Sequence, residues 1–152
     1  MKPTLFLRIA SVLTLIHSAL HTIGGVFGKP SPGIATTTME TMKANAFSAL
    51  GVTRTYFDFF RGMGLAVTIF LTIEAIVFWQ LGTLAKTDAV RLRPILATFL
   101  VGYLAMTVNS YFYFFAGPVV AELLIAASLG MAIAIAKAPD PVRSSQFAAG
   151  RA

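Results

Sequence analysis

The sequence predicts an all-α protein, a four-helix transmembrane bundle, and three observations lead to this fold class. Hydrophobic residues make up 57% of the 152-residue chain and charged residues only 12%, which lies outside the usual composition of soluble domains. Four apolar stretches, each close to the roughly 20 residues that a spanning helix needs, occupy most of the chain. Basic residues flank alternate ends of these stretches. An integral membrane protein is therefore expected.

The four apolar stretches define a single membrane domain, residues 1–137, and leave no room for a separate soluble domain. The expected spans are at about residues 5–28, 57–85, 94–115 and 118–136. The charged residues within their apolar centres are Glu74 and Glu122. Residues 138–152 are expected to form a flexible cytoplasmic tail.

The distribution of positive charge predicts the orientation of the spans. Of the twelve basic residues, eight lie before or in the first turn of the first span, between the second and third spans, or after the fourth: Lys2, Arg8, Lys86, Arg91, Arg93, Lys137, Arg143 and Arg151. The positive-inside rule then places both termini in the cytoplasm. Because these charges lie at helix ends, the net charge of +6 does not indicate a nucleic-acid partner. The lack of cysteine excludes disulfides and thiol redox chemistry.

The connection between the first two spans is expected to contain a short amphipathic helix at about residues 38–50. Two prolines within residues 29–33 favour an irregular turn before it. Thr37 and Glu40 have the spacing of a capping box, and apolar residues then recur at helical intervals until Gly51. We expect this helix to lie on the outer membrane surface, where it either covers helix ends or forms a lid over a pocket.

Polar side chains of the spans concentrate toward the outer side of the predicted membrane. A charge near the bilayer centre costs roughly 2.5–3.5 kcal/mol on insertion scales, so such groups normally face protein or water. The residues concerned are His17, His21, Asp58, Arg61, Asn109, Tyr113 and Glu122. Residues three or four positions apart share a helix face, so each span offers one polar stripe. The sequence therefore predicts an outer-leaflet polar pocket.

Glu122 and His21 are the candidate catalytic residues, because a carboxyl group in an apolar surround and an imidazole can exchange protons with a substrate. The candidate substrate-binding residues are His17, Asn109, Tyr113, Asp58 and Arg61. Purely structural roles are the alternatives. Asp58 and Arg61 would then form a salt bridge at the rim of the bundle, and Glu122 would form a hydrogen bond with Asn109 or a histidine. His17 and His21, four residues apart, can alternatively ligate a metal or haem iron.

Glu74 falls outside the predicted pocket, because it lies about 160° around its helix from Asp58 at 100° per residue. It is expected to face another helix, an oligomer partner or a separate cavity. A neutral carboxyl group is expected if no cation pairs with it.

Three short stretches carry a family resemblance: His21-Thr22-Ile23-Gly24-Gly25, Asp58-Phe59-Phe60-Arg61-Gly62 and Asn109-Ser110-Tyr111-Phe112. They resemble small four-span bacterial inner-membrane proteins of the DoxX-like kind. The resemblance covers the spans and implies a multi-pass protein of the bacterial inner (plasma) membrane. In residue type, the polar cluster is similar to that of emopamil-binding sterol isomerases, in which polar residues within a membrane bundle shift a double bond.

Three functional hypotheses follow. In the first, the pocket binds a lipophilic substrate such as an isoprenoid, a sterol-like lipid or a quinone, and whether it also transforms that substrate by acid/base chemistry is left open. In the second, the protein is an accessory subunit of a larger membrane complex or a homo-oligomer. In the third, His17 and His21 hold haem or a metal. The first hypothesis is ranked ahead, with membrane lipid as the expected partner and quinone or haem as the candidate cofactor.

Overall fold

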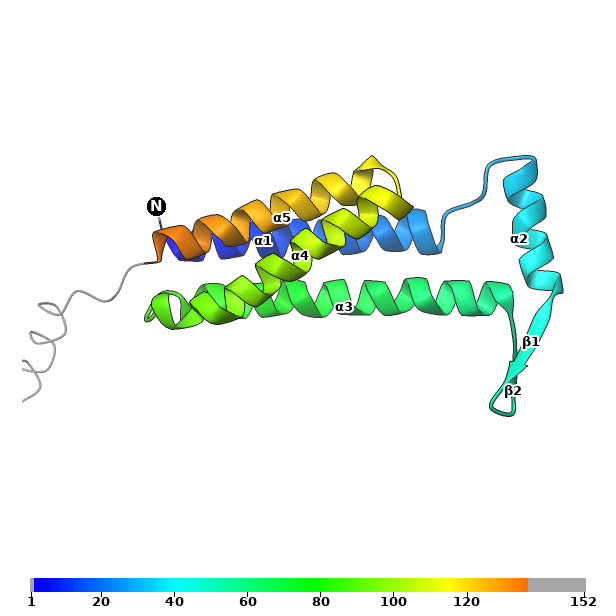
Figure 1. Ribbon diagram of the computed structural model, residues 1–152, viewed down its shortest axis with the longest axis horizontal. Helices are drawn as coiled ribbons and strands as arrows, with labels where there is room; N and C mark the ends of the chain where they lie inside the picture. The colour runs from blue at the N-terminus through cyan, green and yellow to red at the C-terminus, as the bar shows by residue number, and fades with distance from the viewer. Residues whose placement is uncertain (1, 137–152) are drawn as a thin grey trace, which may run out of the picture. The chain divides into compact units, whose positions relative to one another are not determined.

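The computed structural model describes residues 2–136 and is mostly helical (Figure 1). Four helical segments are long and apolar enough to cross a membrane: Pro3–Val26, Tyr56–Leu84, Val90–Tyr113 and Ala116–Ile135. Each begins and ends within a few residues of a predicted span. By length and composition, the chain therefore fits a multi-pass membrane protein. The predicted tail, residues 138–152, lies outside the described residues.

The chain divides into two compact units. Unit 1 contains the chain up to Thr14 and the chain from Glu74 onward, and unit 2 is Leu15–Ile73. Two long helices, α1 (Pro3–Leu20) and α3 (Tyr56–Leu84), therefore contribute one part to each unit.

Unit 1 is built from parts of α1 and α3 together with a 3-10 turn and two complete helices. The turn is η2 (Val90–Leu92), and the helices are α4 (Arg93–Tyr113) and α5 (Ala116–Ile135). Pro94 lies in the first turn of α4, where a missing backbone N–H costs nothing. Phe114 and Phe115 are extended and reverse the chain between α4 and α5, which pack against each other.

The core of unit 1 combines large apolar side chains with alanines. Phe78, Leu7, Leu96, Ile125 and Leu129 are almost completely buried. The Phe78 ring meets the Phe99 ring edge-on, with 4.9 Å between the ring centroids. Alanines on α1 and α5 line the same core, at Ala10, Ala126 and Ala132. Small residues let helices approach closely in a membrane, where lipid supplies no hydrophobic drive for helix association.

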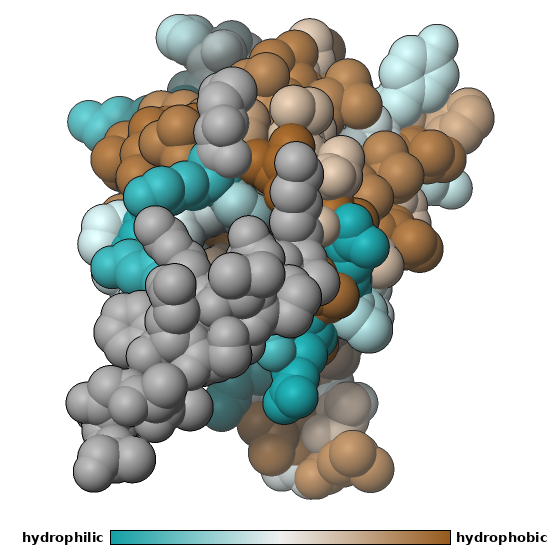
Figure 2. Space-filling model, turned by 90° about the vertical axis from the view of Figure 1, so that its left-hand side faces the viewer, coloured by the Kyte–Doolittle hydropathy of each residue, from teal (hydrophilic) through white to brown (hydrophobic). Residues whose placement is uncertain are grey.

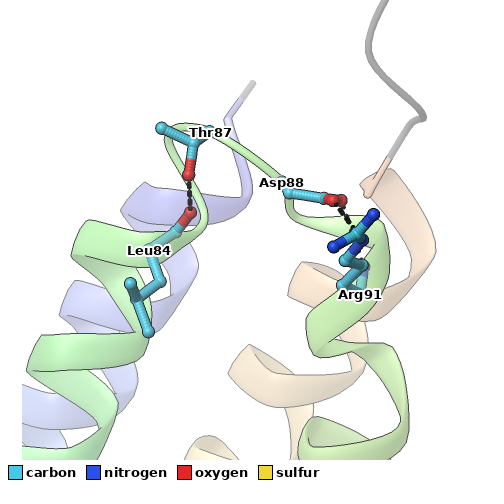
Figure 3. Close-up of polar contacts among 4 residues, drawn as sticks. All are labelled: Leu84, Thr87, Asp88 and Arg91. Atoms are coloured by element: carbon cyan, nitrogen blue, oxygen red, sulfur yellow. Dashed lines mark hydrogen bonds and ion pairs between the residues drawn. The ribbon is translucent and has the colours of Figure 1, made fainter.

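Local hydrogen bonds shape the turn between α3 and α4 (Figure 3). The Thr87 hydroxyl donates to the carbonyl of Leu84 at 2.9 Å, which caps the end of α3. Asp88 accepts from the backbone N–H of Arg91 at 3.3 Å and forms an ion pair of 2.8 Å with its guanidinium. The side chain of Arg93 donates to the carbonyls of Ile133 and Ala136 at 3.2 and 2.8 Å, so carbonyl groups at the end of α5 gain hydrogen-bond donors. Figure 2 looks onto this end and shows hydrophilic side chains beside the hydrophobic sides of the helices.

Unit 2 contains the irregular part of the chain. After α1, residues His21–Val26 form a π-helix, η1. Helix α2 (Ile34–Ala44) follows, and then the antiparallel strands β1 (Ala46–Ala49) and β2 (Val52–Thr55). Leu50 and Gly51 join the strands with φ of 50° and 79°, the pair of positive values that a tight type I′ hairpin turn requires.

The hairpin corrects two predictions. The fold is mostly helical and not all-α, and the predicted helix at 38–50 is wrong at both ends, because α2 begins after Gly33 and ends at Ala44. Thr37 does not cap it, since the Thr37 N–H already donates to the carbonyl of Gly33. β-branched residues around Gly51 favour the strand, and the Phe47 ring packs on Tyr56 at 5.1 Å between centroids.

The core position of Phe78 generates a stability prediction. We expect Phe78→Ala to lower the free energy of unfolding by about 3–5 kcal/mol, because it leaves a cavity between α1, α3 and α4. The matched control is Phe112→Ala in α4, whose side chain is 71% exposed. Reversible unfolding in lipid–detergent micelles, followed by circular dichroism, measures both. Equal losses in the two variants would contradict the packing of unit 1.

Candidate polar sites within the two helical units

The first site of unit 1 joins Glu122 of α5 to Ser110 of α4. The Ser110 hydroxyl donates to Glu122 Oε1 at 2.9 Å, and the two residues are only 1% and 3% exposed. The second carboxyl oxygen, Oε2, is buried and has no hydrogen-bond partner among the described residues. Buried polar atoms almost always have a hydrogen-bond partner, so Oε2 is an unused hydrogen-bonding position between α4 and α5.

Ser110 makes the hydrogen bond to Glu122 that the sequence analysis suggested for Asn109. The buried face of α4 runs through Leu96, Tyr103 and Ser110 at seven-residue steps, and Asn109 lies about 100° away from that face and is exposed. Tyr113, at the end of α4, is 78% exposed. The structure therefore brings neither Asn109 nor Tyr113 into hydrogen-bonding contact with Glu122, and their role in substrate binding stays a prediction.

A second polar cluster in unit 1 involves Glu74, which the sequence left without a partner. The Tyr103 hydroxyl of α4 lies 2.6 Å from Glu74 Oε2 of α3. Its oxygen is also 3.4 Å from the hydroxyl of Thr14 in α1, which donates to the carbonyl of Ala10 at 2.9 Å. Tyr103 and Thr14 are buried and Glu74 is half-buried. Three helices thus contribute one oxygen-bearing side chain each.

The sequence did contain a signal for this cluster. Tyr103 lies seven residues before Ser110, so both fall on one face of the helix. What the sequence does not contain is the rotation of α4 relative to α3, which decides whether Tyr103 meets Glu74.

In unit 2, hydroxyl groups link α1 and its π-helix to α3. Ser18 donates to the carbonyl of Thr68 at 3.2 Å and lies 3.0 Å from the Thr72 hydroxyl, while Thr22 lies 2.9 Å from the Thr68 hydroxyl. His21 continues this line, because its Nε2 lies 3.0 Å from the carbonyl oxygen of Gly64. A carbonyl accepts only, so Nε2 carries the proton in this contact.

The π-helix changes the face that the sequence predicted for the histidines. An α-helix would put Gly24, seven residues after His17, on nearly the same face as His17, but Gly24 is exposed. Gly25 lies against the His21 ring, and Val26 faces α3. A π-turn holds more residues than an α-turn, so positions after His21 move around the helix axis. A Cβ at Gly64 would lie 3.0 Å from Val26, so only glycine fits without a shift.

Metal or haem binding by the two histidines stays a prediction. His21 Nε2 is engaged with Gly64, and the residues that the structure describes contain no group of three or more His, Asp or Glu side chains suited to a metal ion. His17 Nδ1 is buried and lacks a hydrogen-bond partner in the described part of the chain. Haem ligation by a single histidine therefore stays a prediction.

Asp58 and Arg61 do not pair with each other. Asp58 and Thr55 cap the start of α3 reciprocally, with 3.0 Å from the Asp58 N–H to the Thr55 hydroxyl and 3.2 Å from the Thr55 N–H to the carboxylate. The Arg61 guanidinium lies over the Phe27 and Phe57 rings, 5.1 Å from each centroid. Across residues 2–136 the one ion pair is Asp88 with Arg91, so the predicted rim salt bridge is wrong.

The two units hold different members of the predicted pocket. Glu122, Asn109 and Tyr113 belong to unit 1, and His17, His21, Asp58 and Arg61 belong to unit 2. A pocket that contains both Glu122 and His21 therefore stays a prediction.

Comparison of the chain with protein-family models, curated proteins and solved structures finds no match. The resemblance to DoxX-like proteins and to sterol isomerases thus stays a prediction from the sequence. Function has to be argued from the side chains themselves.

The contact between Ser110 and Glu122 generates the second prediction. We expect Ser110→Ala to lower the free energy of unfolding by about 1–2 kcal/mol, because it removes the hydrogen-bond donor that Glu122 has in the bundle. In a Glu122→Leu background the same substitution should cost almost nothing. The control is Ser128→Ala, whose hydroxyl bonds only within its own helix, to the carbonyl of Leu124. The cycle is measured by unfolding in micelles, and equal effects of Ser110→Ala in both backgrounds would contradict the contact.

Proposed function

We propose that this protein is a multi-pass membrane protein that binds a lipophilic molecule with a polar head, of the isoprenoid, sterol-like or quinone class. The observation that carries the proposal is the buried Oε2 of Glu122, which has no partner among the described residues. A carboxylate accepts from a hydroxyl group, and a protonated carboxyl group donates to a carbonyl. Glu122 thus suits the head of an alcohol, a quinol or a quinone.

The surroundings of Glu122 support a lipophilic ligand. Its buried neighbours along α5 are Ile125, Ala126 and Leu129, which offer apolar contacts and no competing hydrogen-bond groups. Glu122 lies six residues into α5, roughly 9 Å from the start of that helix. Exposed aromatic side chains of residues 111–115 precede the same helix end, as is typical of the membrane–water boundary. A ligand head held there leaves its apolar tail in hydrocarbon.

In the catalytic version of this proposal, the protein also transforms the bound molecule by acid–base chemistry. Glu122 would exchange a proton with the ligand, and His21, whose Nε2 faces the carbonyl of Gly64, would act as the second proton-transfer group. This form requires both side chains to reach one ligand, whereas binding requires Glu122 alone.

Haem or metal binding is the second candidate, and the buried, unpartnered Nδ1 of His17 favours it. A purified protein with a Soret absorption band that is lost in His17→Ala would support it. The Glu122 proposal does not predict such a band.

Ligand retention tests the main proposal. Native mass spectrometry of gently extracted protein should show a retained lipid or quinone, and Glu122→Leu should reduce the bound fraction about tenfold through loss of one charge-assisted or carboxyl hydrogen bond. Ser128→Ala, which changes a hydroxyl bonded within its own helix, should retain the ligand. Unchanged retention in Glu122→Leu would reject the assigned site. Copurification with unrelated membrane subunits, without a ligand, would favour the accessory role.

The orientation of the spans is part of the proposal, with both termini in the cytoplasm of a bacterial inner membrane. The excess of basic residues at one set of helix ends and the DoxX-like resemblance support it. Because the chain has no cysteine, single cysteines report location without background. In intact cells we expect Ser31→Cys to react with a membrane-impermeant maleimide and Thr87→Cys to react only after permeabilisation. The reverse pattern would invert the proposed topology.

A further inference from the structure

We infer that Glu74, Tyr103 and Thr14 form a proton-exchange site inside the membrane, separate from the Glu122 site. Glu74 takes up and releases the proton, and the two hydroxyl groups change the direction of their hydrogen bonds as it does so. The inference does not depend on a ligand at Glu122.

The position of Glu74 along α3 places its carboxyl group deep in the span. It lies ten residues before the end of α3 at Leu84, which corresponds to roughly 15 Å of helix. The hydrocarbon core is about 30 Å thick, so a side chain at this point lies near its middle. Ionisable residues at that depth normally mark proton or ion paths.

Among the described residues of unit 1, no charged group pairs with Glu74. On α1, the Arg8 guanidinium bonds the Thr83 hydroxyl and stacks on Trp79, 3.5 Å from the ring centroid. On α4, Arg93 is engaged at the end of α5. On α5, the ionisable group is Glu122, which Ser110 holds. An unpaired carboxylate is costly in hydrocarbon, so the carboxyl group of Glu74 depends on hydrogen bonds in both of its protonation forms.

The structure has the Tyr103 O–H donating to Glu74 Oε2 across 2.6 Å, which is the direction of the ionised form. The same distances also fit the acid form. There the carboxyl O–H donates to the Tyr103 oxygen, the Tyr103 O–H turns to Thr14 across 3.4 Å, and the Thr14 O–H donates to the carbonyl of Ala10 across 2.9 Å. Each hydroxyl group donates once and accepts once. The chain ends on a backbone carbonyl, so no proton is left without an acceptor.

The same atoms also fit the ionised form. When the carboxyl group releases its proton, the Tyr103 O–H turns from Thr14 to the carboxylate, where a short charge-assisted hydrogen bond forms. Thr14 keeps its bond to Ala10. The two forms differ by one proton and by the rotation of one phenolic hydroxyl, so exchange needs no movement of a helix.

Opposite effects of the two hydroxyl groups distinguish proton exchange from a purely structural contact. Tyr103→Phe removes the charge-assisted donor to the carboxylate as well as the weaker acceptor of the carboxyl O–H, so the pH midpoint of the labelling described below should rise. Thr14→Val removes the acceptor that Tyr103 uses only in the acid form, so this midpoint should fall. A contact that only holds helices together has no reason to shift the midpoint in opposite directions.

The experiment uses dicyclohexylcarbodiimide on the full chain in liposomes at a series of pH values. This apolar reagent reacts with protonated carboxyl groups in membranes: the carboxyl oxygen bonds to the carbodiimide carbon, the proton moves to nitrogen, and nothing leaves. We expect the peptide with Glu74 to gain the mass of one reagent molecule, with labelling that decreases as pH rises. Glu74→Gln should abolish this adduct, and the control Glu122→Gln should retain it.

Infrared difference spectroscopy provides the second readout and does not require access for the reagent. A pH-dependent carbonyl band of a protonated carboxyl group should be present in the wild-type protein and absent from Glu74→Gln. Absence of that band from the wild type, or midpoints that Tyr103→Phe and Thr14→Val leave unchanged, would overturn the inference. Loss of ligand in Glu122→Leu with an intact Glu74 band would separate the two sites. Retention of ligand in Glu122→Leu with an intact Glu74 band would reject the Glu122 proposal alone.

Discussion

Hydrocarbon offers no water to polar groups, and this constraint organises the whole chain. Hydroxyl groups in the spans donate to carbonyls of their own helix, as Thr107 does to Tyr103, or to the neighbouring helix, as Ser11 does to Ala75. The remaining surface of the spans carries large apolar side chains, which lipid can cover. Among the described residues, the buried side-chain atoms that depart from this rule belong to Arg8, His17, Arg61 and Glu122.

The two carboxyl groups of unit 1 meet that constraint in different ways. Glu74 is part of a hydrogen-bond chain that ends on the backbone of α1, so the protein alone satisfies it. Glu122 has one oxygen held by Ser110 and the other left open. The first arrangement suits an exchange of protons within the protein, and the second suits a partner from outside it.

Span length and apolar composition were enough to predict the four long helices, because crossing hydrocarbon restricts both. The hairpin was missed, since Phe47 and Leu50 also fit a helical period and only the positive φ at Leu50 and Gly51 reveals the turn. Polar residues were recognised by type, but their partners were not. Ser110 and Asn109 are neighbours in sequence, and only the packing of α4 on α5 decides that Ser110 meets Glu122.

The π-helix has a consequence for how the first span can vary. His21 and Val26 are five residues apart, a separation that puts two side chains about 140° apart on an α-helix. Yet His21 Nε2 lies 3.0 Å from the Gly64 carbonyl, and Val26 lies so near Gly64 that a Cβ there would be 3.0 Å away. The extra residue in the turn brings them onto one side. Loss of a single residue between them would restore regular α geometry and release one of the two contacts. Insertions and deletions in this segment are therefore constrained by one glycine on another helix.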